Sequence, residues 1–239
     1  MNKEEFINSV KNLNISINED KLKKLDIYAK FLLEYNEHTN LTAIKNIEDI
    51  YCKHFYDSLT ISKVIDLNEC ETLLDFGTGA GFPGMVLKIF YPNLKVTLVD
   101  SNNKKTKFLF SLCEKLCIND INIINDRVEN LWKDYLNYFD CVTARAVSNM
   151  SVLTELAMPL VKEDKYFVAM KGSNKKEIDE ALYAVEKMKG IIDNIATFTL
   201  YENCGERNIV KIKKISKSKL DNLRSYDKII KKPLKNSSN

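Results

Sequence analysis

The sequence has few histidines and no apolar run near the ~20 residues that a membrane-spanning helix needs. It contains only two histidines, His38 and His54, and no CxxC pair among its six cysteines. Zinc and iron–sulfur sites need closely spaced ligands of these types. We therefore expect no metal site and interpret the cysteines as buried or idle thiols, at positions 52, 70, 113, 117, 141 and 204.

The N-terminus lacks the apolar region of a signal peptide, because residues 1–5 read MNKEE. We therefore expect a cytoplasmic protein that does not bind membranes. There are no coiled-coil heptads, so a monomer is expected, and no Gly-, Ser- or Pro-rich linker divides the core. We divide the chain into a helical N-terminal region (1–66), a cofactor-binding domain (67–215) and a basic C-terminal tail (216–239).

Charge is unevenly distributed along the chain. Residues 211–239 hold ten Lys or Arg against two Asp, a charge of +8, which leaves −5 for the rest of a chain whose net charge is +3. A basic end of this kind is either a solvated, partly disordered segment or a contact to nucleic-acid phosphates that does not read sequence. Both interpretations stay open at this point.

The apolar pattern predicts helices first and then an alternation of strands and helices. Helices are expected near residues 3–12, 19–37 and 49–65. The later alternation is typical of an α/β protein with parallel strands and helices on both faces of the sheet. Its expected strands are 72–76, 95–99, 121–124, 139–143 and 166–170, and its helices 83–90, 103–117, 128–136, 149–161 and 175–188. Two last runs, 191–200 and 208–214, are expected to pair antiparallel at the sheet end.

The stretch from Leu73 to Gly84 combines an apolar run ending in Asp75 with three glycines at alternate positions, Gly77, Gly79 and Gly81. It reads as a strand, a tight turn and the start of a helix. Glycines let the backbone approach a ligand closely, and a helix N-terminus attracts anions. The stretch therefore predicts a site for a nucleotide-type cofactor.

Two cofactors compete for this site. Residues 79–84 match the GxGxxG pattern of dinucleotide binding, which would suit an NAD-linked oxidoreductase. The carboxylate of Asp75 would face a pyrophosphate unfavourably, whereas it would attract the ammonium and sulfonium groups of S-adenosylmethionine. Asp100, followed by Ser101, stands at the end of the next strand, where ribose hydroxyls need an acceptor. We favour S-adenosylmethionine, and we note that Asp100 could instead be a simple helix N-cap.

Further motifs occur in a fixed order, and with them the chain resembles the RsmG (GidB) family of bacterial methyltransferases. That family modifies N7 of a guanosine in 16S ribosomal RNA. The resemblance is carried by residues 35–36, 40–44, 54–59, 75–84, 98–101, 108–109, 126–129, 143–146, 171–172 and 206–207. It implies a class I, Rossmann-like fold with a seven-stranded, mostly parallel sheet and a small helical N-terminal region. It also implies 16S rRNA or the small ribosomal subunit as partner.

The resemblance further implies cofactor contacts. Gly77 and Phe82 fall on the family's glycine-loop contacts, Val128-Glu129 on its adenine-side pair, and Arg145 on its arginine after the fourth strand. The family usually has Lys-Arg where Lys104-Lys105 stand, so a point charge replaces the planar guanidinium fork there. Phe82 could cover the cofactor or pack under the turn.

The residue types agree with N7 methylation. Guanine N7 has a free lone pair at neutral pH, so the protein needs only to align it with the methyl group and exclude water. We therefore expect no general base. Arg145 is the first candidate for orienting the donor or the guanine, with a phosphate contact or a structural ion pair as the alternatives.

Other polar residues are candidates for RNA contact: His54, Asp57, Lys104, Lys105, Lys171 and Arg207. His54 and Asp57 lie three residues apart on a predicted helix and form either a substrate-facing cluster or a core contact that locks the N-terminal helices onto the sheet. Lys171 meets RNA phosphate or is a solvated strand end. A non-catalytic RNA-binding or ribosome-binding protein on the same fold is the second alternative function.

Overall fold

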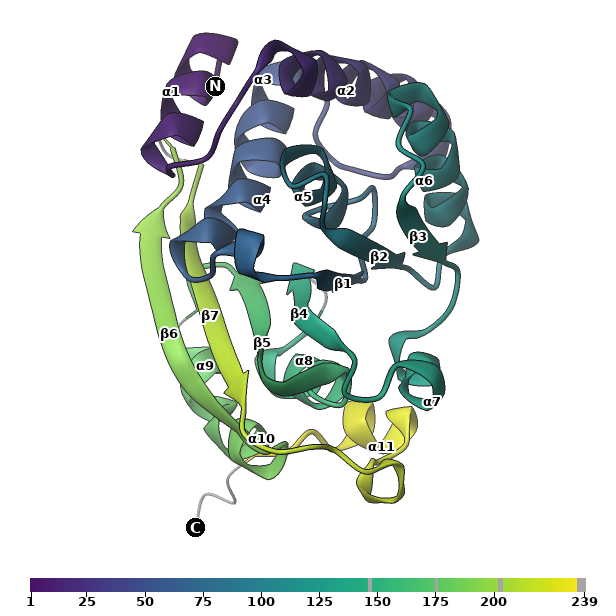
Figure 1. The fold of residues 1–239 in the computed structure, drawn as a ribbon, viewed down its shortest axis with the longest axis vertical. Helices are drawn as coiled ribbons and strands as arrows, with labels where there is room; N and C mark the ends of the chain where they lie inside the picture. The colour runs from purple at the N-terminus through teal and green to yellow at the C-terminus, as the bar shows by residue number, and fades with distance from the viewer. Residues whose placement is uncertain (146–147, 175, 202–203, 236–239) are drawn as a thin grey trace.

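The computed structural model describes residues 1–145, 148–174, 176–201 and 204–235 (Figure 1). The chain begins with two of the predicted helices, α1 (Lys3–Asn12) and α2 (Glu19–Thr39). Asn2 caps α1, and Asn18 caps α2, through side-chain oxygens that accept from the first turn. The C-cap of α2 is Asn40, whose φ of 53° lies in the left-handed region that asparagine tolerates.

The third helical segment is less regular than predicted. In place of one helix over 49–65 it runs from α3 (Ile47–Ile50) through a π-helical turn (Tyr51–Tyr56) and α4 (Asp57–Leu59) to a 3₁₀ turn (Thr60–Lys63). Apolar spacing identifies a helical segment but does not separate these hydrogen-bonding patterns.

The sheet has seven strands in the order β3-β2-β1-β4-β5-β7-β6. All pairs from β3 to β5 are parallel, and β7 pairs antiparallel with β6, as predicted, and also with β5. Strands β4 and β5 are longer than expected, and β5 begins at Val161 because that residue pairs with Phe139 ahead of a bulge. The bounds are β1 Thr72–Phe76, β2 Lys95–Val99, β3 Ile121–Ile124, β4 Phe139–Arg145, β5 Val161–Lys171, β6 Gly190–Thr199 and β7 Glu206–Lys214.

Side chains alternate between two apolar cores, one on each face of the sheet. Leu73 joins the core that also contains α1, α2, α5 (Gly84–Phe90) and α6 (Asn103–Leu116). Its neighbour Leu74 joins the core on the opposite face. That second core is covered by α7 (Trp132–Tyr135), α8 (Met150–Ala157), α9 (Lys176–Glu180) and α10 (Leu182–Lys187). Helices therefore lie on both faces, as predicted (Figure 1).

The N-terminal helices share a core with the sheet domain. Phe6 of α1 and Tyr28 of α2 are fully buried in the same cluster as Leu73 and Leu98. The Tyr28 hydroxyl donates a hydrogen bond to the carbonyl of Ala80 in the glycine turn. Helix α2 therefore supports the turn on which the predicted cofactor site depends.

The basic tail folds onto the domain. It forms a 3₁₀ turn (Leu220–Asn222) and α11 (Tyr226–Lys231), in which Ile229 is 1% exposed. Most residues of this segment are exposed, but the partly disordered end that the charge suggested is wrong for its described part. That part is anchored to Glu155, a buried residue of α8 that tail composition does not reveal. Residues 236–239 lie outside the described part of the chain. Among the helices of the described residues, none is long and apolar enough to span a bilayer.

Candidate cofactor and substrate site

The glycine turn connects β1 to α5 through left-handed backbone. Gly77, Gly79 and Gly81 have φ values of 64°, 62° and 99°, which other residues rarely adopt. The turn crosses toward the end of β2, where Thr78 N donates to Val99 O (3.2 Å) and Gly79 N to Asp100 Oδ2 (2.9 Å). Three alternate glycines are therefore a backbone requirement of this bend, as the sequence predicted.

Asp75 lies beneath the turn. Because it alternates with Leu74 and Phe76 along β1, its carboxylate faces α5, where Oδ2 accepts from Thr78 Oγ1 (2.6 Å) and Gly84 N (2.8 Å). It is fully buried, and burial raises its pKa to about 7. Its Oδ2 holds the turn in place, whereas its buried Oδ1 has no hydrogen-bond partner among the described residues. The attraction of a cofactor ammonium by Asp75 stays a prediction.

A cavity of about 620 Å³ opens at the carboxyl ends of β1, β2 and β4. Of the predicted cofactor residues, it is lined by Gly77, Asp100, Ser101, Val128, Glu129 and Arg145. Gly79 and Phe82 are not in its lining. Lys105, predicted to contact RNA, lines the same cavity, whereas Lys104 is exposed outside it.

Asp100 is held by three contacts. Its Oδ2 accepts from Gly79 N and lies 3.4 Å from Lys105 Nζ, and its Oδ1 accepts from Asn102 N at 2.9 Å. The N-cap of α6 is Asn102, so the N-cap interpretation of Asp100 is wrong. The carboxylate instead joins the glycine turn to the start of α6 at the wall of the cavity.

Phe82 packs under the turn. Its ring stacks on Tyr28 with centroids 5.3 Å apart and on His54 at 4.3 Å, and it is 5% exposed. The resemblance placed Phe82 among the cofactor contacts, but the ring is buried between the N-terminal helices and the turn. The alternative of a packing role therefore fits the geometry.

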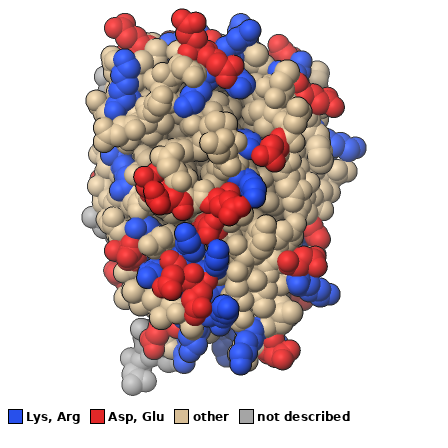
Figure 2. Space-filling view, viewed as in Figure 1, with Lys and Arg blue, Asp and Glu red and all other residues tan. Residues whose placement is uncertain are grey.

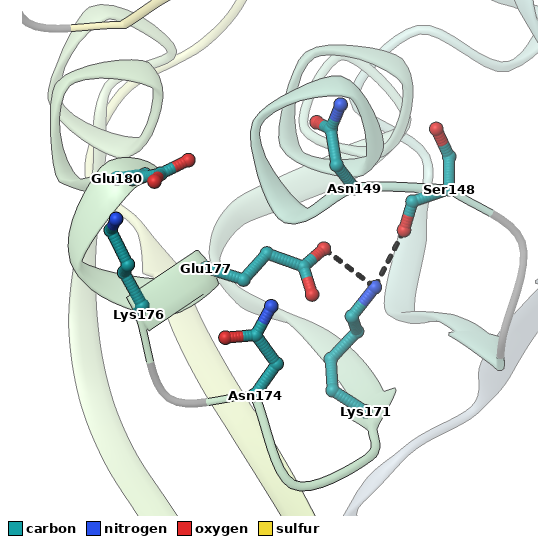
Figure 3. A pocket seen from close by; sticks show the side chains of 7 residues that line it. All are labelled: Ser148, Asn149, Lys171, Asn174, Lys176, Glu177 and Glu180. Atoms are coloured by element: carbon teal, nitrogen blue, oxygen red, sulfur yellow. Dashed lines mark hydrogen bonds and ion pairs between the residues drawn. The ribbon is translucent and has the colours of Figure 1, made fainter.

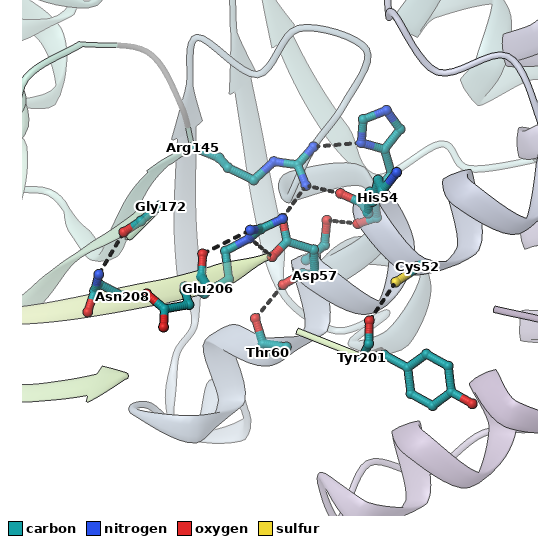
Figure 4. Close-up of polar contacts among 12 residues, drawn as sticks. Cys52, His54, Asp57, Thr60, Arg145, Gly172, Tyr201, Glu206 and Asn208 are labelled. Carbon is teal, nitrogen blue, oxygen red and sulfur yellow. Dashed lines mark hydrogen bonds and ion pairs between the residues drawn. The ribbon is translucent and has the colours of Figure 1, made fainter. Parts of the chain in front are cut away.

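Arg145 is tied to the N-terminal helical segment (Figure 4). Its Nη1 donates to Asp57 Oδ2 (2.9 Å) and Lys53 O (3.0 Å), and its Nη2 lies 3.1 Å from His54 Nδ1. A guanidinium only donates, so Nδ1 accepts and the ring proton sits on Nε2, which faces Thr42 Oγ1 at 2.9 Å. Arg145 thus has the structural ion pair that was one of its alternatives, while also lining the cavity. Ala146 of the same motif lies outside the described residues.

Asp57 joins two strands that are far apart in sequence. Its Oδ1 accepts from Arg207 Nε of β7 at 2.9 Å, while Oδ2 binds Arg145 of β4. Asp57 is 4% exposed. The sequence grouped His54, Asp57 and Arg207 as RNA contacts, and the structure brings all three together around Arg145. In this arrangement they lock the N-terminal helices onto the sheet, the second interpretation of the His54–Asp57 pair.

His54 gives this cluster a pH dependence. Burial and the Arg145 charge lower its pKa to about 3, from about 6.5 in an unfolded chain. Between these values the unfolded state binds a proton that the folded state does not, so stability is lost as pH falls through this range. We expect His54→Gln to reduce the loss in free energy of unfolding between pH 7.5 and 5.0 by about 2 kcal/mol, measured by urea denaturation.

The matched control is His38→Gln, because His38 is the only other histidine and is exposed on α2. Between pH 7.5 and 5.0, the free energy of unfolding of His38→Gln should fall by as much as that of the parent protein. Asp75, with its raised pKa, makes the opposite contribution, since stability falls as pH rises from about 4 to about 7. That contribution is common to all three proteins. Equal losses in His54→Gln and His38→Gln would contradict a buried, neutral His54.

Lys171 does not end in solvent. Its ammonium donates to Ser148 O (2.5 Å) and pairs with Glu177 of α9 (2.8 Å), and its side chain is only 10% exposed (Figure 3). These groups line a second, polar cavity of about 550 Å³ beside the carboxyl end of β5. The solvated-end interpretation of Lys171 is therefore wrong, because the pairing partner comes from a helix that follows the strand.

Sequence reasoning did not name six residues that line the cofactor cavity: Phe76, Val99, Asp126, Arg127, Leu156 and Tyr226. Arg127 Cζ lies 3.7 Å from the centre of the Tyr226 ring, and Arg127 Nε lies 2.9 Å from Glu129 Oε1. Arg127 sits within a motif that the resemblance included. No local signal connects Tyr226, in the tail, with a cavity built about 100 residues earlier. No group of three or more His, Cys, Asp or Glu that could hold a metal occurs within the part of the chain that the structure describes.

The strand order, the glycine turn and the cavity at the carboxyl ends of the strands define a class I, S-adenosylmethionine-dependent methyltransferase. A solved structure, M. jannaschii TYW2 in complex with AdoMet, has the same fold. It gives a TM-score of 0.53 at 13% identity over 66% of this chain and 75% of that chain. The cavity residues fit an adenosyl group, because Val128 and Leu156 offer apolar walls and Asp100 offers an acceptor at the end of β2.

The model of the family described as GidB, rRNA small subunit methyltransferase G, matches residues 21–210. The chain is 42% identical over 217 residues to the Ribosomal RNA small subunit methyltransferase G of Oceanobacillus iheyensis, covering 90% of this chain and 91% of the relative. The protein of the same name from Staphylococcus aureus (strain Newman) is 44% identical over 207 residues, covering 86% and 87%. The chain belongs to this family, which confirms the resemblance and excludes the NAD-linked alternative.

Proposed function

We propose that this protein transfers a methyl group from S-adenosylmethionine to N7 of a guanosine in the 16S ribosomal RNA of the small subunit. The observation that carries the proposal is the cavity between the glycine turn and Val128-Glu129, in a chain of the rRNA small subunit methyltransferase G family. The names of the relatives support an rRNA substrate. The choice of N7 as the target atom follows from the family resemblance and from the free lone pair of N7, which needs no general base.

Different residues of the cavity would contact different parts of the cofactor. The Asp100 carboxylate would accept from ribose hydroxyls, and Val128 and Glu129 would contact the adenine side. When bound, S-adenosylmethionine supplies an electrophilic methyl group. Guanine N7 presents its own lone pair, so no side chain has to remove a proton before transfer. Alignment and exclusion of water are the contributions required of the protein.

Arg145 acts mainly through position. Its guanidinium is fixed by Asp57, Lys53 O and His54, so it cannot swing freely to a substrate group. It still lines the cavity and carries positive charge beside the neutral His54 ring. We infer that Arg145 sets the shape and potential of the cavity edge where the guanosine enters.

The basic surface groups give the protein a means of binding RNA backbone. Basic side chains are spread over the face shown in Figure 2 and are interspersed with acidic ones, toward its lower edge as well. Phosphate contacts of this kind supply affinity rather than sequence reading. We propose a cytoplasmic protein that acts as a monomer on ribosomal RNA.

The proposal predicts a specific chemical change in cells. Nucleosides from 16S rRNA of a strain without the gene should lack one 7-methylguanosine that mass spectrometry detects in the parent strain. A plasmid copy of the intact gene should restore it, and a copy encoding Gly81→Ala should not. An unchanged 7-methylguanosine content in the deletion strain would contradict the proposal.

A further inference from the structure

One wall of the cofactor cavity comes from the C-terminal segment. Tyr226, the first residue of α11, lines the cavity together with Val128 and Glu129. The Arg127 guanidinium lies over its ring and also forms an ion pair with Glu129. Resting on the proposed use of S-adenosylmethionine, we propose that Tyr226 binds the adenosyl end of the cofactor and that residues 220–235 form a clasp completing the site.

The clasp is anchored by a buried carboxylate. Glu155 of α8 is 2% exposed and accepts from Arg224 through both oxygens, from Nη2 at 2.6 Å and from Nε at 2.8 Å. The Glu155 carboxylate also accepts from Leu234 N at 3.1 Å, and Arg224 Nη1 donates to Lys232 O at 2.9 Å. A bidentate, charge-assisted pair with a buried carboxylate holds the segments on both sides of α11.

The anchor adjoins the cavity. Glu155 immediately precedes Leu156, whose side chain lines the cavity and whose carbonyl accepts from Trp132 Nε1 at 3.1 Å. In Figure 1, α11 lies beside α7, the helix that contains Trp132. Displacement of the clasp would therefore remove Tyr226 from the cavity and leave the neighbouring wall exposed to solvent.

An aromatic ring suits this position. Adenine is a flat π-system, and a tyrosine ring offers it a large, rigid contact that costs little conformational entropy. The Arg127 guanidinium, within 3.7 Å of the ring centre, keeps the ring oriented. With Tyr226 at the cavity, the tail contributes to cofactor binding, a function that its positive charge does not indicate.

Isothermal calorimetry with S-adenosylhomocysteine tests the binding role. We expect Tyr226→Ala to raise Kd about tenfold and Tyr226→Phe, which keeps the ring, to stay within about threefold of the parent protein. The matched control is Tyr183→Ala. Tyr183 also has a cation over its ring, with Lys187 Nζ 5.1 Å from the ring centre, but it does not line the cavity. Equal affinity in Tyr226→Ala and Tyr183→Ala overturns the proposal.

Limited trypsin digestion tests the clasp. Because ligand and clasp stabilise each other reciprocally, S-adenosylhomocysteine should slow cleavage after Arg224 and Lys228 in the parent protein but not in Tyr226→Ala. If S-adenosylhomocysteine leaves the cleavage rates of the parent protein unchanged, the proposed clasp is wrong. A parent protein that binds no S-adenosylhomocysteine contradicts the proposed function itself, whereas tight binding with no effect of Tyr226→Ala contradicts only this inference.

Discussion

Replacing Asp57 by alanine is expected to lower the free energy of unfolding by about 3 kcal/mol, as for other buried ion pairs that lose one partner. The substitution leaves the guanidiniums of Arg145 and Arg207 without their shared carboxylate. Their side chains are 14% and 21% exposed, so water replaces the lost partner only in part. Urea denaturation at pH 7.5 measures the change.

Asp49→Ala is the matched control for this prediction. Asp49 lies in α3, ahead of the π-helical turn, and pairs with Lys53 at 2.9 Å, but both side chains are more than a third exposed. Surface pairs of this kind contribute about 0.5 kcal/mol. Similar losses in Asp57→Ala and Asp49→Ala would mean that the Asp57 cluster does not hold the N-terminal helices on the sheet.

Replacing Gly81 by alanine is expected to destabilise the fold by about 2–5 kcal/mol and to abolish cofactor binding. A Cβ on Gly81 would lie 2.6 Å from the Tyr28 hydroxyl, 2.8 Å from Met85 Cβ and 3.0 Å from Leu109 Cδ2. Its φ of 99° adds strain for any residue with a side chain. Thermal unfolding and calorimetry with S-adenosylhomocysteine measure the two effects.

The neighbouring glycine supplies the comparison. Gly79 has a φ of 62°, but a Cβ there meets no atom within 4 Å. Gly79→Ala should therefore cost only the conformational term, about 1–2 kcal/mol. If Gly79→Ala were as destabilising as Gly81→Ala, the support of the turn by Tyr28 and α6 would not be what fixes its shape.

The sheet could be predicted from sequence because its signals are local. Strands β1, β2 and β3 begin and end where the apolar runs do, and the antiparallel β6–β7 pair follows from two such runs joined by a polar loop. The last residues of β4 and the first residues of β5 could not be predicted, because these extensions depend on the pairing of the two strands with each other. The π-helical turn at Tyr51–Tyr56 likewise leaves no mark in apolar spacing.

The site was predictable where a motif places a residue at a strand end. Gly77, Asp100 and Val128 reached the cavity because the carboxyl ends of parallel strands meet at one edge. The orientation of Asp75 depends instead on which face of β1 it takes, and the pairing of Lys171 with Glu177 depends on α9. Tyr226 depends on the long-range pair between Arg224 and Glu155. Contacts of this kind are properties of the folded chain that spacing does not encode.

The most direct test of the account is transfer of an isotopically labelled methyl group by the purified protein. S-adenosylmethionine with a labelled methyl is incubated with small-subunit ribosomal RNA, and the digested nucleosides are analysed by mass spectrometry. We predict label in 7-methylguanosine alone, and none when the Gly81→Ala protein is used. Label in another nucleoside, or no label with the intact protein on either free RNA or assembled subunits, would contradict the account.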